Sequence, residues 1–253
     1  LPTIRSCTNA WMKKPEVKEV LTGVQARGTE DGFFYNSFII QYGVEDKLLF
    51  SNDMFAFYKQ LKSSQRPVCL VNGGIPAPTA EEISAIKRQN YSDADQLAAG
   101  LSRNIQVSAS AELQRLMVKT FIDLVLEEAK TCGGTLSRLT NKAVYLLVWL
   151  KRYQKELFSN WKMPEISVFV LFGKCASPNE ALFLRFLARL PVDVLVLLPN
   201  LNEGSSLHDP SLLELRFEES LPMEQFPVEP SQIRVSTAAY QAERDLDSLM
   251  YQD

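Results

Sequence analysis

The chain is poor in the residues that build metal centres and disulfide frameworks. Its 253 residues include four cysteines and one histidine. The cysteines stand singly at positions 7, 69, 132 and 175, without the paired spacing of a zinc site or of a disulfide-stapled domain. We therefore expect reduced thiols and no metal, as in a cytoplasmic protein.

Two classes of partner are disfavoured by what the sequence has little of. The longest apolar runs, such as 143–150 and 192–198, are far shorter than the roughly 20 residues that span a bilayer. We therefore expect no membrane contact. The formal net charge is -3, whereas proteins that bind nucleic acid without sequence preference are usually clearly basic. The charge therefore disfavours nucleic-acid binding, which would need a local basic face.

The residues that are present predict an α/β fold in three regions. Hydrophobic residues make up 46% of the chain, which suits one large domain or two lobes. We expect an N-terminal α/β region over 1–91, a helical region over 92–165 and a Rossmann-like region over 166–253. The sequence leaves open whether the two α/β regions share one sheet.

The N-terminal region has the order strand, helix, strand. GFFYNSFIIQYGV is rich in β-forming residues, DMFAFYKQLKSS repeats apolar residues at helical spacing, and RPVCLVNG contains a short apolar strand. Asp53 is a candidate N-cap for the helix. This order predicts a βαβ-like unit.

The middle region is helical throughout. Three segments repeat apolar residues every three or four positions, and Gly133 and Gly134 end the second of them. Its broad apolar stripe favours core packing over a partner-binding groove. The basic cluster Lys151, Arg152 and Lys155 is typical of a solvated face near a helix C-terminus.

The C-terminal region carries the strongest architectural signal. ISVFVLFG and DVLVLLPN are nearly continuous apolar runs, which are typical of strands buried on both faces of a parallel sheet. Between them, Ser177, Pro178 and Glu180 occupy the N-cap, first-turn and capping-box positions of a helix. The pattern predicts a right-handed βαβ crossover.

A candidate ligand site follows from that crossover, because ligands of such sheets bind beyond the carboxyl ends of the strands. We call the turn that follows each strand a corner. The corner after the first strand contains Gly173, Lys174 and Ser177, and the corner after the second strand contains Asn200. A helix start with a lysine beside it suits a phosphate. Yet FGKCASPNE is neither GxGxxG nor GxxxxGK[ST], and Pro178 removes one donor, so the sequence favours a plain capped crossover over a phosphate site.

A similar corner occurs earlier in the chain. In VNGGIPAPTAEEI a strand runs into Gly73 and Gly74, and Thr79 then caps a helix with Glu82 three residues later. The glycines allow a backbone to approach a ligand closely, although an ordinary strand-to-helix turn explains them too. The two corners suggest a distant internal repeat.

No constellation fixes a reaction or a cofactor, so enzymatic activity stays undetermined. Cys175 precedes a helix start beside Lys174, which would favour a reactive thiolate, but small hydrophobic filler is the simpler role. His208 lies in a loop without a GxSxG nucleophile elbow, which makes a hydrolase triad improbable. The acidic loop around 203–219 suits either a divalent ion or plain solvation.

Three segments together resemble the bacterial YceG-like family. They are NGGIPAPTAEEI, SPNEALFLRFLARLPVDVLVLLPN and the terminal STAAYQAERDLDSLMYQD. The family is labelled as a component of a biosynthetic module in tellurite-resistance and stress gene neighbourhoods. The resemblance covers most of the chain and is looser in the helical region. It implies a cytoplasmic protein that works with other stress-operon products on a nucleotide-like or sugar-phosphate ligand, and it transfers no active-site residues.

Two functional hypotheses follow. In the first, the chain binds or processes a phosphorylated metabolite at the carboxyl edge of its parallel sheet. In the second, it is a noncatalytic scaffold whose helical region and acidic loops recruit partner proteins. The last residues, QAERDLDSLMYQD, have an amphipathic helical pattern that suggests continuation into a longer parent protein.

Overall fold

The computed structural model describes residues 6–28, 34–107, 110–131, 133–228 and 242. Its centre is a five-stranded sheet in the order β4-β5-β6-β3-β7, in which all neighbouring strands are parallel. The five strands are β3 (Phe38–Tyr42), β4 (Val68–Asn72), β5 (Ser167–Phe172), β6 (Val192–Leu198) and β7 (Leu213–Arg216). The predicted α/β class is confirmed.

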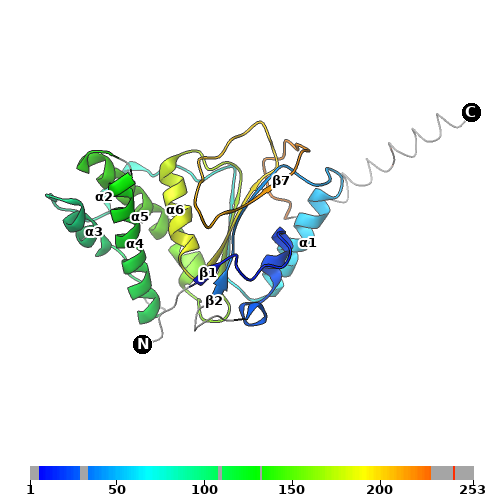
Figure 1. Cartoon of the computed structure of the whole chain (residues 1–253), viewed down its shortest axis with the longest axis horizontal. Coiled ribbons are helices and arrows are strands. Elements are labelled where there is room, and N and C mark those ends of the chain that lie inside the picture. Colours follow the sequence, from blue (N-terminus) through cyan, green and yellow to red (C-terminus); the bar gives the residue numbers. More distant parts are fainter. Residues whose placement is uncertain (1–5, 29–33, 108–109, 132, 229–241, 243–253) are drawn as a thin grey trace, which may run out of the picture.

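Helices cover both faces of this sheet (Figure 1). On one side lies α1, and on the other lie α6 and α5, with α2, α3 and α4 farther from the strands. The α-helices are α1 (Phe50–Ser63), α2 (Ala80–Ser84), α3 (Ala94–Ser102), α4 (Ala111–Thr131), α5 (Leu136–Phe158) and α6 (Pro178–Ala188). The smaller elements are β1 (Ser6–Thr8), β2 (Phe34–Asn36) and the 3-10 helices η1 (Val17–Leu21) and η2 (Val24–Arg27).

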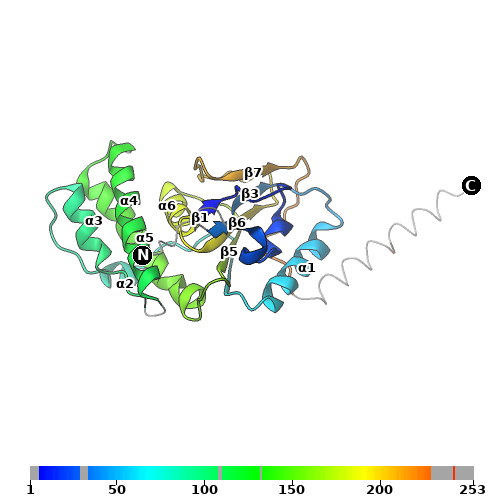
Figure 2. The same cartoon turned by 60° about the horizontal axis from the view of Figure 1, so that its bottom comes forward.

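Both predicted α/β regions contribute strands to the same sheet. The early strand β3 lies between the late strands β6 and β7, and Phe38 is in register with Val194. Figure 2 shows β7, β3, β6 and β5 side by side in this order. The question that the sequence left open is therefore answered: the N- and C-terminal α/β regions form one sheet.

Alternation along β3 explains how the sheet holds two cores. Successive side chains of a strand point to opposite faces. Phe38 and Ile40 accordingly join the core under α5 and α6, whereas Ile39 joins the core under α1. Because both faces are covered, β5 and β6 are buried along their whole length, as their continuous apolar runs predict.

Helix starts follow the predicted capping residues in most cases. Thr79 and Glu82 form a complete capping box, and the Oγ atom of Ser177 accepts the Glu180 amide. The prediction for Asp53 was wrong, because α1 begins at Phe50 and Asp53 falls inside its first turn. Asp46 instead accepts the amide of Leu48 just before the helix.

The middle of the chain contains α3, α4 and α5, and its basic cluster is not simply solvated. Arg152 makes a two-pronged contact with Glu82, at 2.9 Å from Nε and 2.7 Å from Nη2. It also donates to the carbonyl of Pro76 at 2.6 Å. Lys151 and Lys155 are exposed, so within the cluster Arg152 is the residue that ties α5 to α2. Trp149 of α5 also donates to the Pro76 carbonyl, at 3.1 Å.

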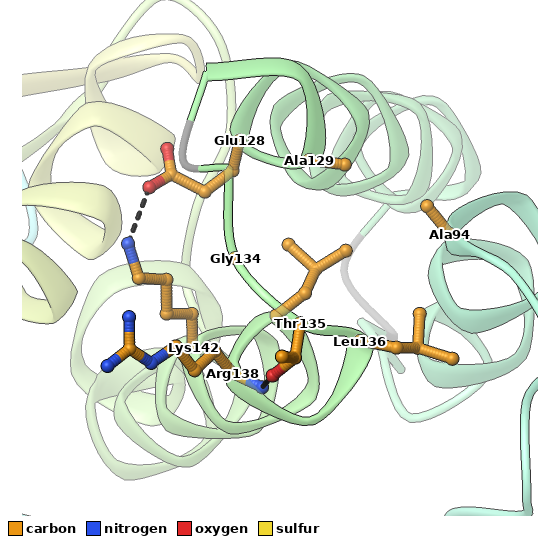
Figure 3. A pocket seen from close by; sticks show the side chains of 9 residues that line it. Ala94, Glu128, Ala129, Gly134, Thr135, Leu136, Arg138 and Lys142 are labelled. Carbon is orange, nitrogen blue, oxygen red and sulfur yellow. Dashed lines mark hydrogen bonds and ion pairs between the residues drawn. The ribbon is translucent and has the colours of Figure 1, made fainter.

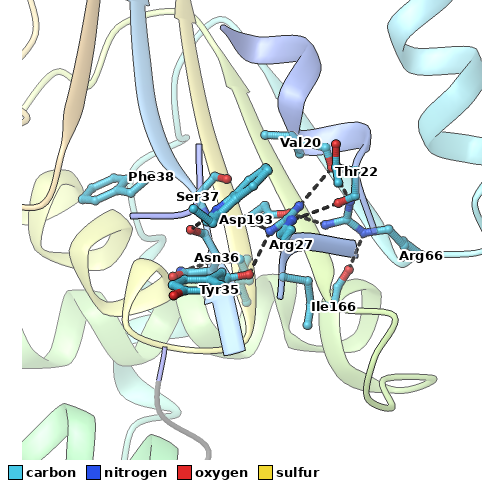
Figure 4. Close-up of polar contacts among 12 residues, drawn as sticks. Val20, Thr22, Arg27, Tyr35, Asn36, Ser37, Phe38, Arg66, Ile166 and Asp193 are labelled. Carbon is cyan, nitrogen blue, oxygen red and sulfur yellow. Dashed lines mark hydrogen bonds and ion pairs between the residues drawn. The ribbon is translucent and has the colours of Figure 1, made fainter. Parts of the chain in front are cut away.

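A buried ionic cluster fastens the amino end of the sheet (Figure 4). Asp193, at the start of β6, is completely buried between Arg27 and Arg66. Arg27 also donates to the carbonyls of Val20, Thr22 and Tyr35, so that all its N–H groups face acceptors. The apolar run DVLVLLPN places Asp193 at the start of a strand, and its two partners come from η2 and from the turn between α1 and β4.

No helix among the described residues is long and apolar enough to cross a membrane. The terminal segment STAAYQAERDLDSLMYQD, and with it the expected amphipathic run, lies outside the described residues except for Ala242.

Candidate ligand-binding edge

The topology creates a switch point between β3 and β6. The chain leaves β3 towards α1 on one face, whereas the connection after β6 places Leu207 in the core of the opposite face and packs Leu212 against it. In doubly wound sheets, ligands bind in the crevice outside the carboxyl ends of the strands at such a point. The carboxyl ends of β3 and β6 are therefore the first place to look for a site.

A segment of the chain itself fills this crevice. We call residues 217–226, which follow β7, the strap. The amide of Phe217 donates to the Tyr42 carbonyl at 2.8 Å, and the Glu219 carbonyl accepts from the Val44 amide at 2.9 Å. A β-carbon at Gly43 would lie 2.7 Å from strap carbonyl oxygens. The strap thus packs directly against the switch point.

The strap then crosses to the far end of the sheet. The Leu221 amide donates to the Pro199 carbonyl at 3.0 Å, and the Phe226 amide donates to Asn72 Oδ1 at 2.8 Å. The Phe226 ring packs at 5.5 Å from Phe172, measured between centroids. The strap is therefore fastened beyond β3, beyond β6 and at the end of β4.

Next to the strap, the corners after β4 and β5 touch each other. The Gly73 amide donates to the Phe172 carbonyl at 2.7 Å. A β-carbon at Gly173 would lie 2.9 Å from the Gly74 nitrogen, and φ is 140° at Gly173 and 104° at Gly74. These three predicted site residues are thus brought together, and their lack of a β-carbon first serves the contact between the two corners.

Lys174 is the charged residue of this pair of corners. Its side chain is exposed and forms no ion pair with any residue that the structure describes. Its backbone lies against the other corner, since a β-carbon at Gly74 would lie 3.5 Å from the Lys174 carbonyl oxygen. A fixed backbone with a free ammonium group at the end of a buried strand suits an anionic ligand.

Ser177 is occupied mainly with capping α6. Its Oγ atom accepts the Glu180 amide at 3.2 Å, and its carbonyl accepts the Ala181 amide at 3.1 Å. Pro178 has no N–H to offer. Within the described chain, Asn179 is the residue of the first turn whose amide keeps no protein acceptor, so this helix start offers little to a phosphate by itself.

Asn200 lies at the same edge of the sheet, next to the strap. Its Oδ1 atom accepts the Asn202 amide at 3.0 Å, and its carbonyl accepts the Glu203 amide at 3.2 Å. The following residue, Leu201, donates its amide to Ser220 of the strap at 2.9 Å. Asn200 therefore shapes a turn, whereas Gly73, Gly74, Gly173 and Lys174 remain grouped.

The thiol of Cys175 does not have the character of a nucleophile. The side chain is fully buried, and burial together with the nearby charge of Glu180 raises its pKa to about 12. A thiol with this pKa carries almost no thiolate at neutral pH. The structure therefore contradicts the reactive-thiolate hypothesis and agrees with a role as core filler.

The other acid-base candidates do not assemble into a site. His208 is exposed. Its neighbour Asp209 accepts from Arg185 at 2.8 Å and from Ser211, which fixes the loop to α6. Within the described ranges, no three His, Cys, Asp or Glu residues lie together in a way that could hold a metal ion.

A separate pocket of about 220 Å³ lies at the turn between α4 and α5 (Figure 3). Ala94, Ala129 and Leu136 form an apolar wall, and Lys142 pairs with Glu128 at 2.7 Å on the other side. Sequence reasoning did not single it out, because helical periodicity accounts for each of these residues. It also missed the strap, whose apolar residues, glutamates and single proline have no regular period.

The fold and this edge define a class: a doubly wound parallel α/β protein in which a C-terminal strap closes the switch point. The chain belongs to the YceG domain family, whose model matches residues 20–251. No curated protein and no solved structure matches the chain.

Proposed function

We propose that the chain binds a phosphorylated, nucleotide-like or sugar-like metabolite where β4 and β5 end, as a component of a stress-linked biosynthetic module of the tellurite-resistance type. The proposal rests chiefly on Lys174. This unpaired cation follows a buried parallel strand, and the adjoining glycine corners bring backbone within reach of a ligand.

The strap supports this location. It packs over the ends of β3 and β6, where a doubly wound sheet would ordinarily bind its ligand, and reaches β4 only through Asn72 and Phe226. The corners that carry Gly73, Gly173 and Lys174 are therefore the part of the edge left for a ligand. A single lysine acts as a point charge, which suits a phosphate group. The residues around it would select the rest of the ligand.

A thermal-shift panel of nucleotides, sugar nucleotides and sugar phosphates tests the proposal. A ligand that binds the folded state alone raises the melting temperature, because it adds a stabilisation that grows with the logarithm of its concentration over Kd. We expect at least one phosphorylated compound to do so, and Lys174→Ala to remove the shift. Lys59→Ala, which changes an exposed lysine on α1, is the matched control and should keep the full shift.

The scaffold hypothesis predicts the opposite pattern. Ligand binding at this edge would be refuted if no compound in the panel shifted the melting temperature and a protein of the same operon bound the wild type and Lys174→Ala equally well. A shift that survives Lys174→Ala would refute the location but not the ligand.

A further inference from the structure

A cationic pocket of about 250 Å³ lies between α2 and α3, outside the sheet. Lys87, Arg88 and Arg103 line it together with Tyr91 and Asn104. None of its lining residues is acidic, and none of the three cations forms an ion pair within the described part of the chain. This local charge is opposite in sign to the net charge of -3 on the whole chain.

The pocket wall is held by a buried amide. Asn104 is 9% exposed, and its Oδ1 atom accepts the Lys87 amide at 2.9 Å. Its Nδ2 atom donates to the Lys87 carbonyl at 2.8 Å and to the Leu101 carbonyl at 3.0 Å. The backbone that carries Lys87 is thereby fixed to the end of α3, so the cations project from a preformed surface.

An aromatic ring forms another part of the wall. Tyr91 packs over Gly100 of α3 so closely that a β-carbon there would lie 2.4 Å from the ring. Glycine in a helix interior costs about 1 kcal/mol relative to alanine. Here the glycine creates room for the hydroxyl-bearing end of the ring to approach the helix beside the cations.

Three cations without counterions around a concave surface repel one another and create a positive potential there. A bound anion would reduce this repulsion. Guanidinium groups suit phosphate oxygens in particular, because their planar forks match the geometry of these oxygens. The pocket volume suits a small ligand, and Tyr91 supplies an aromatic ring beside the cations on which a planar base can pack.

We propose that this cationic pocket is a second ligand site, which binds a nucleotide through its phosphates at Lys87, Arg88 and Arg103 and through its base at Tyr91. The site is independent of Lys174 and of the carboxyl edge of the sheet. It gives the chain a local basic face despite its acidic composition.

Calorimetric titration of the full chain with ADP, pyrophosphate and adenosine tests the site. We expect ADP to bind most tightly, pyrophosphate more weakly and adenosine not measurably. Arg88→Gln and Arg103→Gln should each weaken ADP about tenfold or more, as the loss of a charge-assisted hydrogen bond predicts. Arg115→Gln, at an exposed position of α4, is the matched control and should leave ADP binding unchanged.

Gly100→Ala separates the aromatic wall from the charges. The new β-carbon displaces the Tyr91 ring without removing a cation, and alanine favours the helix, so loss of folding is not expected. This variant should weaken ADP several-fold while leaving pyrophosphate unchanged. Equal losses for both ligands would overturn the role of the ring.

Two further results would overturn the proposal. One is ADP binding that is absent or unaffected by the two arginine variants. The other is a single-stranded RNA that binds far more tightly than ADP and depends on the same arginines, which would make the pocket part of a nucleic-acid surface. Lys174→Ala should leave calorimetric ADP binding at this site intact. The thermal-shift test of the carboxyl edge is therefore made in a chain that also carries Arg88→Gln and Arg103→Gln, where this pocket does not contribute and failure of either site is distinguishable.

Discussion

Arg27 holds Asp193 with both terminal nitrogens of its guanidinium group, at 2.9 Å to Oδ1 and 2.7 Å to Oδ2. The two residues are separated by 166 positions in the chain, and both side chains are excluded from solvent. Removing one partner of a buried pair leaves an uncompensated charge, which is far more costly than losing an exposed pair.

Asp193→Asn should therefore lower the free energy of unfolding by about 3–5 kcal/mol, because Arg27 and Arg66 keep their charges without a counterion. Urea denaturation at neutral pH measures this loss. Glu214→Gln, which removes an exposed ion pair with Arg216, is the control and should cost less than about 1 kcal/mol. Similar losses for the two variants would contradict the structural role of the buried cluster.

The same cluster predicts a dependence on pH. Burial by itself raises the pKa of the Asp193 carboxyl, but Arg27 and Arg66 outweigh burial and lower it. A lowered folded-state pKa means that the carboxylate stabilises the fold above its unfolded pKa of about 3.9, and that this contribution is lost as pH falls. Acid titration of stability should therefore be shallower for Asp193→Asn than for the wild type. Parallel curves would refute the prediction.

Gly173→Ala should be strongly destabilising. The residue has a φ of 140°, and a β-carbon would meet the backbone of the neighbouring corner at 2.9 Å. The backbone conformation alone costs roughly 1–3 kcal/mol for a non-glycine residue, and the clash adds to it. Gly23→Ala is the matched control, since its β-carbon would meet no atom within 4 Å. Chemical denaturation of both variants checks the prediction, and equal stabilities would contradict it.

Phe226→Ala should release the strap. The ring contacts Phe172 and Tyr58 at centroid distances of 5.5 and 5.7 Å, and truncation of a buried phenylalanine costs about 3 kcal/mol. Hydrogen exchange should accelerate at the amides of Val44 and Leu221, which form hydrogen bonds that involve the strap. Val228→Ala, at a position that is 40% exposed, should leave exchange unchanged. Unchanged protection in Phe226→Ala would show that the strap does not depend on this anchor.

The buried thiols should resist alkylation in the folded state. Burial raises the pKa of both Cys69 and Cys175, so neither forms much thiolate at pH 8. Mass spectrometry after iodoacetamide treatment should find these two residues unmodified in the native protein and modified in urea. Rapid native modification of Cys175 would restore the nucleophile hypothesis.

Much of the fold is predictable from local patterns. The buried strands, the long helices of the middle region and the caps at Thr79 and Ser177 follow from periodicity and from residue preferences that act within a few positions. The order of the strands does not follow, because β3, β5 and β6 have the same apolar texture and nothing in it specifies which lie side by side.

The candidate sites are predictable only in part. The glycine corners and Lys174 belong to a strand-to-helix pattern that is visible in sequence. The strap is not, since its fastening depends on backbone hydrogen bonds that any residue type could make. The partners of Asp193 were missed for a related reason: an aspartate in an apolar run shows that compensation is needed, but not which distant arginines supply it.

The position of β3 constrains how the chain can assemble. This strand is synthesised early, whereas both of its neighbours, β6 and β7, come from the last third of the chain. The amide of Ser37, just before β3, donates to Asp193, which lies 156 positions later. Because such distant contacts carry a large loop-closure entropy, they form late and slowly. During synthesis on a ribosome, the first strand of the sheet must therefore remain without its partners until almost the whole domain has emerged.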